Sequence, residues 1–182
     1  MSFYKRTKRI MDERAFEDLV KKEKEKLYRI AFLYVKNEND ALDIVQETIY
    51  KAFTSIETLR EVKYFSTWIT RILINNALDF LKKQKKILLS DEIDKINNLN
   101  NEKAEDKIDL VNAVKRLKEP YKTAIILRFY KDFTIKQIAN ILDCPEGTVK
   151  TYIHRGIYKL KLDLGKEYVK WSKICLTFLK MK

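Results

Sequence analysis

The sequence predicts an all-α protein made of two small helical domains joined by a flexible acidic linker. Only three glycines and two prolines occur among 182 residues, which is too few for a fold built on tight β-turns. Apolar residues instead recur at helical spacing through most of the chain. The net charge of +12 favours a polyanionic partner, and nucleic acid is the obvious candidate.

Three helices are expected in the first domain. Asp12 can cap the first helix, whose apolar periodicity ends near Lys36. Asn39 can cap the second helix, and Ser66 can cap the third, which should run to about Lys86. The apolar side of the second helix is expected to be buried and consists of Leu42, Val45, Ile49, Ala52 and Phe53.

A change in composition marks the boundary between the domains. Residues 89–107 hold more acidic residues than lysines, together with four asparagines, so this stretch is a negative linker in a basic protein. It separates a first domain at residues 10–88 from a second at residues 108–165. The tail, residues 166–182, fits an amphipathic helix packed on the second domain, a partner-binding segment or a weak membrane-surface element.

The second domain contains the pattern of a helix-turn-helix. Two supporting helices are expected between residues 110 and 129, interrupted at Glu119–Pro120. Thr134 and Gln137 then have the spacing of a capping box, which starts the next helix. Pro145 suits the first turn of the helix after it, because its missing N–H costs nothing there. Such a helix pair is typical of readers of duplex DNA.

The last helix has two different faces. One face is apolar and consists of Val149, Ile153, Gly156, Leu160 and Leu164. The opposite face carries no carboxylate before Asp163 and consists of Lys150, Thr151, His154, Tyr158 and Lys161, flanked by Arg155. A surface that lies in a DNA groove must exclude acids, so this face is expected to bind DNA. The alternative is a helical hairpin with a basic surface.

The third helix places an aromatic ring on its polar side. Trp68 shares that side with cations and an amide, and Tyr64 and Phe65 stand just before the helix. Rings stack on unpaired bases, amides read base edges and lysines hold the backbone, which together favour single-strand binding. Alternatively, Trp68 covers the seam between helices. The polar members of this side are Arg71, Asn75, Asp79, Lys82 and Lys86.

The second helix has an acidic face. Asp40, Asp43 and Glu47 project together, and Ile44 is expected to stand among them, exposed, 200° from Leu42. An apolar anchor ringed by charges suits a protein partner. A solvated face is the alternative, and a catalytic or metal-binding role is disfavoured because no histidine or glycine-rich loop supports the carboxylates.

Several function classes are excluded by composition. His154 is the only histidine, and Cys144 and Cys175 have no metal-ligand spacing, so no metal, no cofactor and no catalytic activity are expected. No apolar run is long enough for a signal peptide or a membrane span. A cytoplasmic protein without a small-molecule substrate is therefore expected.

Three segments in this order resemble the extracytoplasmic-function sigma factors of the sigma-70 family. They are ENDALDIVQETIYKAF (38–53), FSTWITRILINNALDFLKK (65–83) and the helix-turn-helix block TIKQIANILDCPEGTVKTYIHRGIYKLK. The likeness covers about residues 12–164, with the first domain as sigma region 2 and the second as sigma region 4. It implies an alternative sigma factor that binds core RNA polymerase and directs it to particular promoters, with no enzymatic activity of its own.

The resemblance also assigns roles to residues. It implies polymerase docking by Asp43, Ile44 and Glu47. It implies recognition and melting of the minus-10 element by Tyr64, Phe65, Trp68, Arg71, Asn75, Lys82 and Lys83. It implies minus-35 recognition by Arg128, Lys150, Thr151, His154 and Arg155. It further implies an anti-sigma factor, often membrane-anchored, that responds to envelope or other stress.

Two other readings compete with the sigma factor. A helix-turn-helix regulator acting without polymerase shares the last helix but needs neither the face around Trp68 nor an acidic docking helix. A nucleic-acid enzyme would use Asp40, Asp43 and Glu47 with magnesium, and the missing second constellation argues against it.

Overall fold

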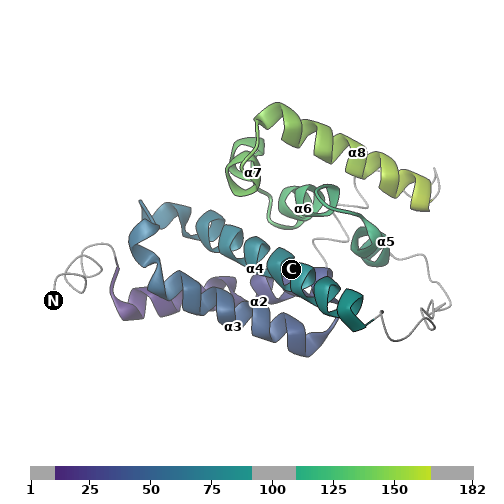
Figure 1. Ribbon diagram of the computed structural model, residues 1–182. Helices are drawn as coiled ribbons and strands as arrows, with labels where there is room; N and C mark the ends of the chain where they lie inside the picture. The colour runs from purple at the N-terminus through teal and green to yellow at the C-terminus, as the bar shows by residue number, and fades with distance from the viewer. Residues whose placement is uncertain (1–10, 92–109, 165–182) are drawn as a thin grey trace.

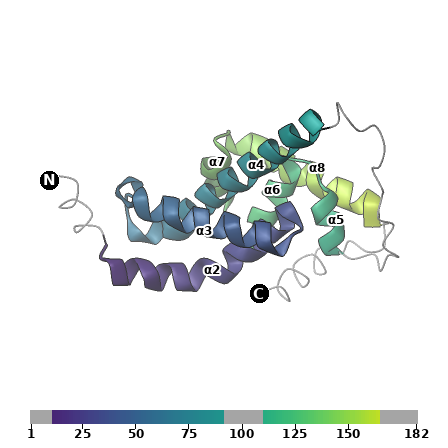
Figure 2. The ribbon, with the colours of Figure 1, turned by 60° about the horizontal axis from the view of Figure 1, so that its bottom comes forward.

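The computed structural model describes residues 11–91 and 110–164, and within these ranges every regular element is a helix (Figure 1). The predicted linker largely, and the predicted tail and Cys175 entirely, lie outside the described residues. Helices α2–α4 form one bundle and α5–α8 form a second group packed along one side of it (Figures 1 and 2). The all-α prediction is confirmed.

The N-terminal bundle begins with α2 (Glu13–Val35). Its first turn is capped as predicted, because the Asp12 carboxylate accepts a hydrogen bond of 2.7 Å from the backbone N–H of Ala15. The helix ends at Lys36, whose φ of 60° lies in the left-handed region. The predicted end is therefore confirmed.

The helix α3 (Glu38–Thr54) follows at once. Its cap is Asn37, which accepts from the N–H of Asp40 at 3.1 Å, so the predicted cap Asn39 was wrong. Two short 3₁₀ turns, η1 (Ile56–Thr58) and η2 (Val62–Tyr64), lead into α4 (Phe65–Asp91). Because η2 runs directly into α4, Ser66 lies inside the helix and is not its cap. The helix also continues beyond the predicted end at residue 86.

The buried face of α3 differs from the predicted one. Leu42 and Phe53 are 44% and 48% exposed, whereas Ile44 is only 3% exposed. The side of α3 that packs on α2 and α4 has small side chains along its middle. Around the helix axis, Ile44 lies closer to this line of small residues than Leu42 does, so Ile44 is buried and Leu42 is not. The small side chains on this line are those of Ala41, Thr48 and Ala52.

A polar contact secures this bundle from inside. The buried Asn76 donates to the hydroxyl of Thr48 at 3.0 Å and accepts from Lys51 at 2.7 Å. The Thr48 hydroxyl in turn donates to the carbonyl of Ile44 at 2.6 Å. Each of these buried groups has a partner, so burial is compatible with their polarity. The network joins α3 to α4 at the level of the middle of both helices.

The C-terminal group is built around the last helix. It comprises α5 (Leu110–Arg116), α6 (Tyr121–Ile125), the π-helical turn η3 (Ile126–Tyr130), α7 (Ile135–Leu142) and α8 (Glu146–Leu164). Arg116 of α5 pairs with Asp163 of α8 at 2.8 Å. The supporting helices that the periodicity predicts between residues 110 and 129 are thus present, and both pack against α8.

Candidate nucleic-acid interface

The helix-turn-helix is fixed by its caps. Thr134 accepts from the N–H of Gln137 at 3.2 Å, and the Gln137 side chain accepts from the N–H of Thr134 at 2.8 Å, which confirms the capping box. Asp143 ends α7 in the left-handed region, with φ of 51°. The carbonyl of Pro145 accepts from Thr148 and Val149, so Pro145 stands at the cap of α8 rather than inside its first turn.

A glycine sets how closely α8 approaches α6. A methyl group built on Gly156 would lie 2.8 Å from Cγ1 of the fully buried Ile125. The absent side chain therefore lets the two helices pack in direct contact. The predicted apolar face of α8 is buried against this scaffold, namely Val149, Ile153, Gly156, Leu160 and Leu164.

The opposite side of α8 forms the recognition face, which we define as Lys150, Thr151, His154 and Arg155. All four residues are exposed. The Thr151 hydroxyl donates to the carbonyl of Gly147 at 3.0 Å, which leaves its acceptor side outward. Arg128 is exposed at η3 and donates to the carbonyl of Phe133 at 3.0 Å, just before α7. The arrangement offers cations and hydrogen-bonding groups on one helix, which suits the major groove of duplex DNA.

The exposed side of α4, together with Tyr64 at the end of η2, forms a second surface. We name it the melting face after the role that the resemblance implies, and define it as Tyr64, Trp68, Arg71, Asn75, Lys82 and Lys83. Trp68 is half-buried, packs near Phe65 and donates from Nε1 to the Thr58 hydroxyl at 3.0 Å. Tyr64 is 46% exposed, with the Lys63 ammonium 4.9 Å from its ring centre. A hydrogen bond to Glu61 raises the pKa of Lys63, so this ammonium stays charged.

One predicted member of this surface is wrong. Phe65 is 2% exposed, and its ring meets that of Phe16 edge to face with 5.9 Å between ring centres. As the first residue of α4, it points into the bundle and closes the core between α2 and α4. Phe65 therefore holds the start of the melting face in place instead of contacting a base.

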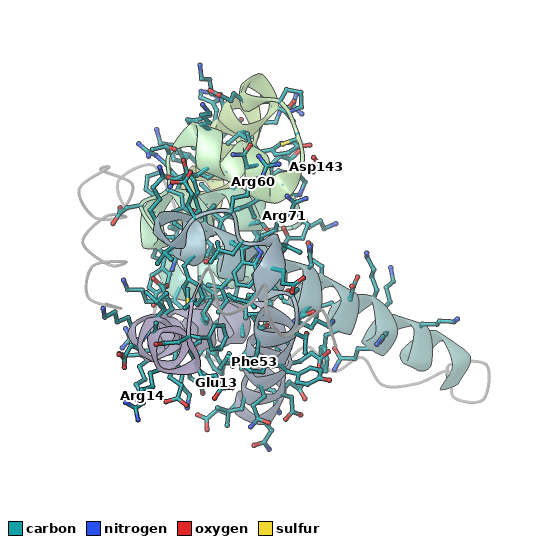
Figure 3. All side chains as sticks on the ribbon, turned by 90° about the vertical axis from the view of Figure 1, so that its left-hand side faces the viewer. Glu13, Arg14, Phe53, Arg60, Arg71 and Asp143 are labelled. Atoms are coloured by element: carbon teal, nitrogen blue, oxygen red, sulfur yellow. The ribbon has the colours of Figure 1, made fainter. Side chains whose placement is uncertain are left out.

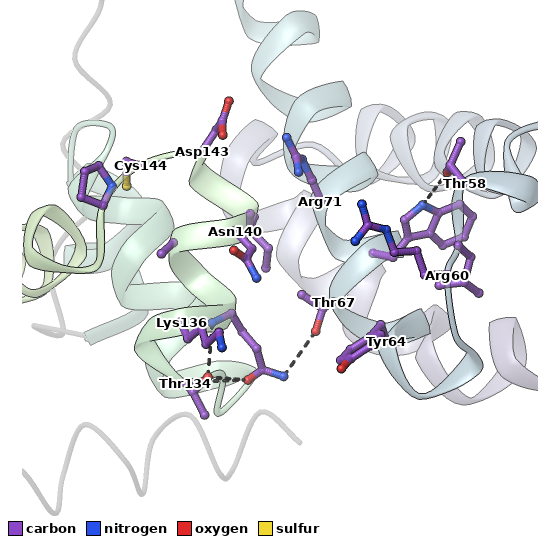
Figure 4. Close-up of a pocket in the computed structure, with 16 residues that line it drawn as sticks. Thr58, Arg60, Tyr64, Thr67, Arg71, Thr134, Lys136, Asn140, Asp143 and Cys144 are labelled. Atoms are coloured by element: carbon purple, nitrogen blue, oxygen red, sulfur yellow. Dashed lines mark hydrogen bonds between the residues drawn. The ribbon is translucent and has the colours of Figure 1, made fainter.

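Residues that the sequence did not single out lie beside the melting face. A cleft of about 910 Å³ separates the start of α4 from α7, and Arg60, Lys136 and Asn140 line it together with Tyr64 and Arg71. Figure 4 shows Arg60 and Arg71 on one wall and Asn140 and Asp143 on the other. Arg60 lies between the two 3₁₀ turns, outside any long helix, so no periodic pattern in the sequence could predict its place in the cleft.

The docking surface on α3 also needs correction. Asp43 and Glu47 are exposed, but Ile44 is part of the core and cannot anchor a partner. Exposed apolar residues do lie on α3. Two of them, Leu42 and Phe53, were predicted to be buried, and a third, Tyr50, is 65% exposed. Figure 3 shows Phe53 at the outer side of the bundle, beside Glu13.

The described residues contain neither a metal-binding cluster nor a membrane-spanning helix. No group of three or more His, Cys, Asp or Glu side chains in residues 11–91 and 110–164 is arranged to hold a metal ion. None of the helices within the same ranges is long and apolar enough to cross a membrane. Cys144, which lines the cleft, has its pKa raised by burial and by the neighbouring Asp143.

Comparison with known proteins matches both domains. The family model for sigma-70 region 2 matches residues 19–87, and that for sigma-70 region 4 matches residues 107–160. The chain is 42% identical over 145 residues to the RNA polymerase sigma factor SigV of Bacillus subtilis (strain 168), covering 79% of this chain and 87% of SigV. It is 31% identical over 182 residues to the ECF RNA polymerase sigma factor SigW of the same organism, and the match covers 90% of this chain and 97% of SigW.

Solved structures show the same fold. The sigma factor RpoE of Bartonella quintana, in complex with the anti-sigma factor NepR, matches with a TM-score of 0.69 at 23% identity, covering 82% of this chain and 96% of RpoE. CnrH, in complex with the cytosolic domain of CnrY, matches with a TM-score of 0.64 at 19% identity, and the match covers 87% of this chain and 92% of CnrH. The chain belongs to the extracytoplasmic-function sigma factors of the sigma-70 family, which are not enzymes but bind core RNA polymerase and direct it to promoters.

Proposed function

We propose that the two surfaces read the two elements of one promoter. The recognition face and Arg128 contact the minus-35 element as duplex DNA, and the melting face holds an unpaired strand of the minus-10 element. The observation that carries this proposal is the presence, on one chain, of an acid-free helix face and of a face that combines rings, an amide and cations. Duplex reading needs the first, and stacking of unpaired bases needs the second.

Polymerase docking is assigned to the outer side of α3. Asp43 and Glu47 supply negative charge, and Leu42, Tyr50 and Phe53 supply the apolar anchors in place of Ile44. An apolar patch ringed by charge is the usual composition of a protein interface. Glu47 lies 3.3 Å from Lys51, so it is oriented by an ion pair within its own helix.

Run-off transcription with purified core polymerase tests the proposal. The chain should initiate at promoters whose minus-35 and minus-10 elements are both intact, and loss of either element should abolish the product. A transcriptional regulator that acts without polymerase docking predicts a different result: tight binding of a duplex operator and no promoter-dependent initiation. Absence of the run-off product with active core polymerase would reject the sigma-factor assignment of these surfaces.

We further propose that an anti-sigma factor holds this protein in the cytoplasm until an envelope or other stress releases it. Two structural relatives support this proposal. RpoE was solved with the anti-sigma factor NepR, and CnrH was solved with the cytosolic domain of CnrY. The test is to add the cytosolic part of a membrane protein encoded beside this chain to the run-off reaction. Suppression of the product supports the proposal, and undiminished transcription at saturating concentration contradicts it for that partner.

A further inference from the structure

The cleft between α4 and α7 has more polar groups than the surfaces assigned above use. Its volume is about 910 Å³, and its walls come from residues 58–71 on one side and residues 134–145 on the other. The Gln137 side chain of α7 donates to the Thr67 hydroxyl of α4 at 3.4 Å and bridges the two walls (Figure 4). Sites for small molecules lie preferentially at such domain boundaries, in clefts of about 300–1,000 Å³.

Three cations line this cleft without a counter-ion. They are Arg60 and Arg71 on the wall of the first domain and Lys136 on α7, and all three are exposed. In the part of the chain that the structure describes, none of the three forms an ion pair or donates a hydrogen bond. By contrast, Lys131, which also meets the first domain, pairs with the Glu23 carboxylate of α2. Uncompensated positive charges around one cavity favour a ligand with several negative charges.

The kind of cation indicates the kind of anion. A guanidinium presents its N–H groups as a planar fork and binds a phosphate through two parallel hydrogen bonds. A lysine ammonium acts at phosphate sites as a compact charge. Two arginines and a lysine along one cleft therefore suit a chain of phosphates.

The rest of the lining suits a planar base. Tyr64 is 46% exposed and lines the cleft together with the half-buried ring of Trp68. Such rings stack on nucleobases. On α7, the exposed Asn140 has no hydrogen-bond partner among the described residues, and an asparagine amide matches the donor and acceptor on the edge of adenine.

One acid shares the cleft with these groups. Asp143 follows α7 and is the single carboxylate among the described residues that line the cleft. It is exposed and forms no ion pair with the cations around it. Carboxylates accept hydrogen bonds from ribose hydroxyls in dinucleotide sites. The lining thus holds a partner for each part of a nucleotide, namely its base, its sugar and its phosphates.

We propose that this cleft binds a nucleoside polyphosphate with an adenine base. The three cations hold the phosphates, Asn140 pairs with the edge of the base beside the ring of Tyr64, and Asp143 accepts from the ribose. A nucleotide in this position occupies Tyr64 and Arg71, which also belong to the melting face, and so excludes an unpaired strand from that part of the free chain. This exclusion rests on the proposed function of the melting face, whereas the binding of the nucleotide does not.

Isothermal titration calorimetry of the whole chain with ATP tests the site. ATP should bind at least tenfold more tightly than AMP, because AMP engages fewer of the three cations. It should also bind at least tenfold more tightly than inorganic triphosphate, which has no base to stack or pair. Equal affinity for ATP and triphosphate would overturn the proposal, since a chain of net charge +12 attracts polyanions without a built site. Absence of ATP binding would overturn it as well.

Substitutions on α7 locate the site. Lys136→Glu should lower the affinity for ATP at least tenfold. Lys159→Glu is the matched control, because it makes the same change of charge at an exposed lysine of the same domain that does not line the cleft. Asn140→Ala should lower the affinity for ATP about fivefold and leave that for triphosphate unchanged. Equal losses in Lys136→Glu and Lys159→Glu would assign the binding to the general charge of the chain and reject the site.

A free nucleotide and a DNA strand share the chemistry of base and phosphate, and a second pair of variants separates them. Lys83 belongs to the melting face but does not line the cleft. Lys83→Glu should therefore weaken binding of a single-stranded oligodeoxynucleotide and leave ATP binding unchanged, whereas Lys136→Glu should weaken ATP binding alone. If Lys136→Glu weakens binding of the oligonucleotide as much as that of ATP, the cleft belongs to the path of the strand and the nucleotide site is wrong.

The nucleotide site and the promoter-reading function fail in different ways. If ATP binds as expected but the chain supports no run-off transcription with active core polymerase, the nucleotide site stands and the promoter-reading function is wrong. If run-off transcription depends on Trp68 but ATP does not bind the free chain, the melting face stands and the nucleotide site is wrong.

Discussion

The indole Nε1 of Trp68 donates a hydrogen bond of 3.0 Å to the hydroxyl of Thr58. This bond ties the ring to the last residue of η1 and so fixes its orientation at the start of the melting face. The ring remains half-buried and packs beside Phe65. The position of Trp68 allowed two interpretations, a ring that stacks on an unpaired base and a ring that covers the seam between helices. The structure is compatible with both, because the ring packs against the bundle and also lines the cleft.

Replacing Trp68 by alanine should slow promoter opening more than formation of the closed complex. We expect roughly a tenfold effect, which corresponds to about 1.4 kcal/mol of lost base stacking, and permanganate footprinting of the melted region measures it. The truncation should also lower the stability of the bundle by about 2 kcal/mol. Ile49→Ala, which removes a half-buried side chain from α3, controls for that loss. Equal opening by both variants would assign Trp68 to packing alone.

Replacing Leu42 by arginine should weaken binding to core polymerase at least tenfold while the helical fold persists. Leu42 is exposed, so its free energy of unfolding should change by no more than about 0.5 kcal/mol, whereas Ile44→Arg buries a charge and should unfold the bundle. Leu42→Met should retain binding. A pull-down with core polymerase and a thermal melt check both statements, and unaltered affinity of Leu42→Arg would move the docking surface elsewhere.

Replacing Arg155 by alanine should reduce transcription about tenfold at promoters that depend on the minus-35 element. Lys159, whose ammonium lies 5.6 Å from the ring centre of Tyr121, is the control because it is directed at α6 rather than at the recognition face. The salt dependence of duplex binding shows which kind of contact Arg155 makes. If Arg155 contacts a phosphate, its loss should lower the slope of log affinity against log salt concentration by about one unit. If it contacts a base, its loss should relax the sequence preference. An equal loss of transcription in Arg155→Ala and Lys159→Ala would indicate a general effect of charge.

The two glycines of α8 should respond oppositely to alanine. Gly147 has open space around its Cα, so Gly147→Ala should stabilise the domain by about 0.5 kcal/mol through helix propensity. Gly156→Ala drives a methyl group into Ile125 and should destabilise it by about 1 kcal/mol net. Chemical denaturation of both variants measures the difference. Stabilisation by both would mean that α6 and α8 can separate at no cost.

Replacing Glu119 by glutamine should change how stability depends on pH. Although part of Glu119 is exposed, the protein around its carboxylate desolvates it and raises its pKa above 4.5, and the bonds from Thr123 and the charge of Lys122 offset this only in part. A carboxyl with a raised pKa in the folded state contributes stability that is fully present below pH 4.5 and is lost as pH rises through the folded pKa.

Denaturation of wild type and Glu119→Gln between pH 4 and pH 7 therefore tests the sign. The wild type should lose stability relative to Glu119→Gln as pH rises, because only the carboxyl ionises and the amide oxygen can still accept from Thr123. Curves that run parallel over this range would show that the carboxylate is as well solvated in the folded chain as in the unfolded one.

Prediction from sequence succeeded where one helix supplies its own signal. The capping box of Thr134 and Gln137 and the cap at Asp12 involve neighbours in sequence, and the apolar face of α8 follows from a simple period. Prediction failed on α3, where the large side chains Leu42 and Phe53 were assigned to the core. Helices that pack closely bury small residues at their contact, so size misled the choice of face.

By itself, the sequence determined the all-α class, the helix-turn-helix and the charge of its outer face, because these depend on spacing along a single helix. Only the tertiary structure decided that Phe65 and Ile44 are buried, that Arg60 lines a cleft with α7, and that Glu23 meets Lys131. These relations join residues far apart in the chain. They depend on how helices are rotated and packed against one another, which no local pattern of polarity encodes.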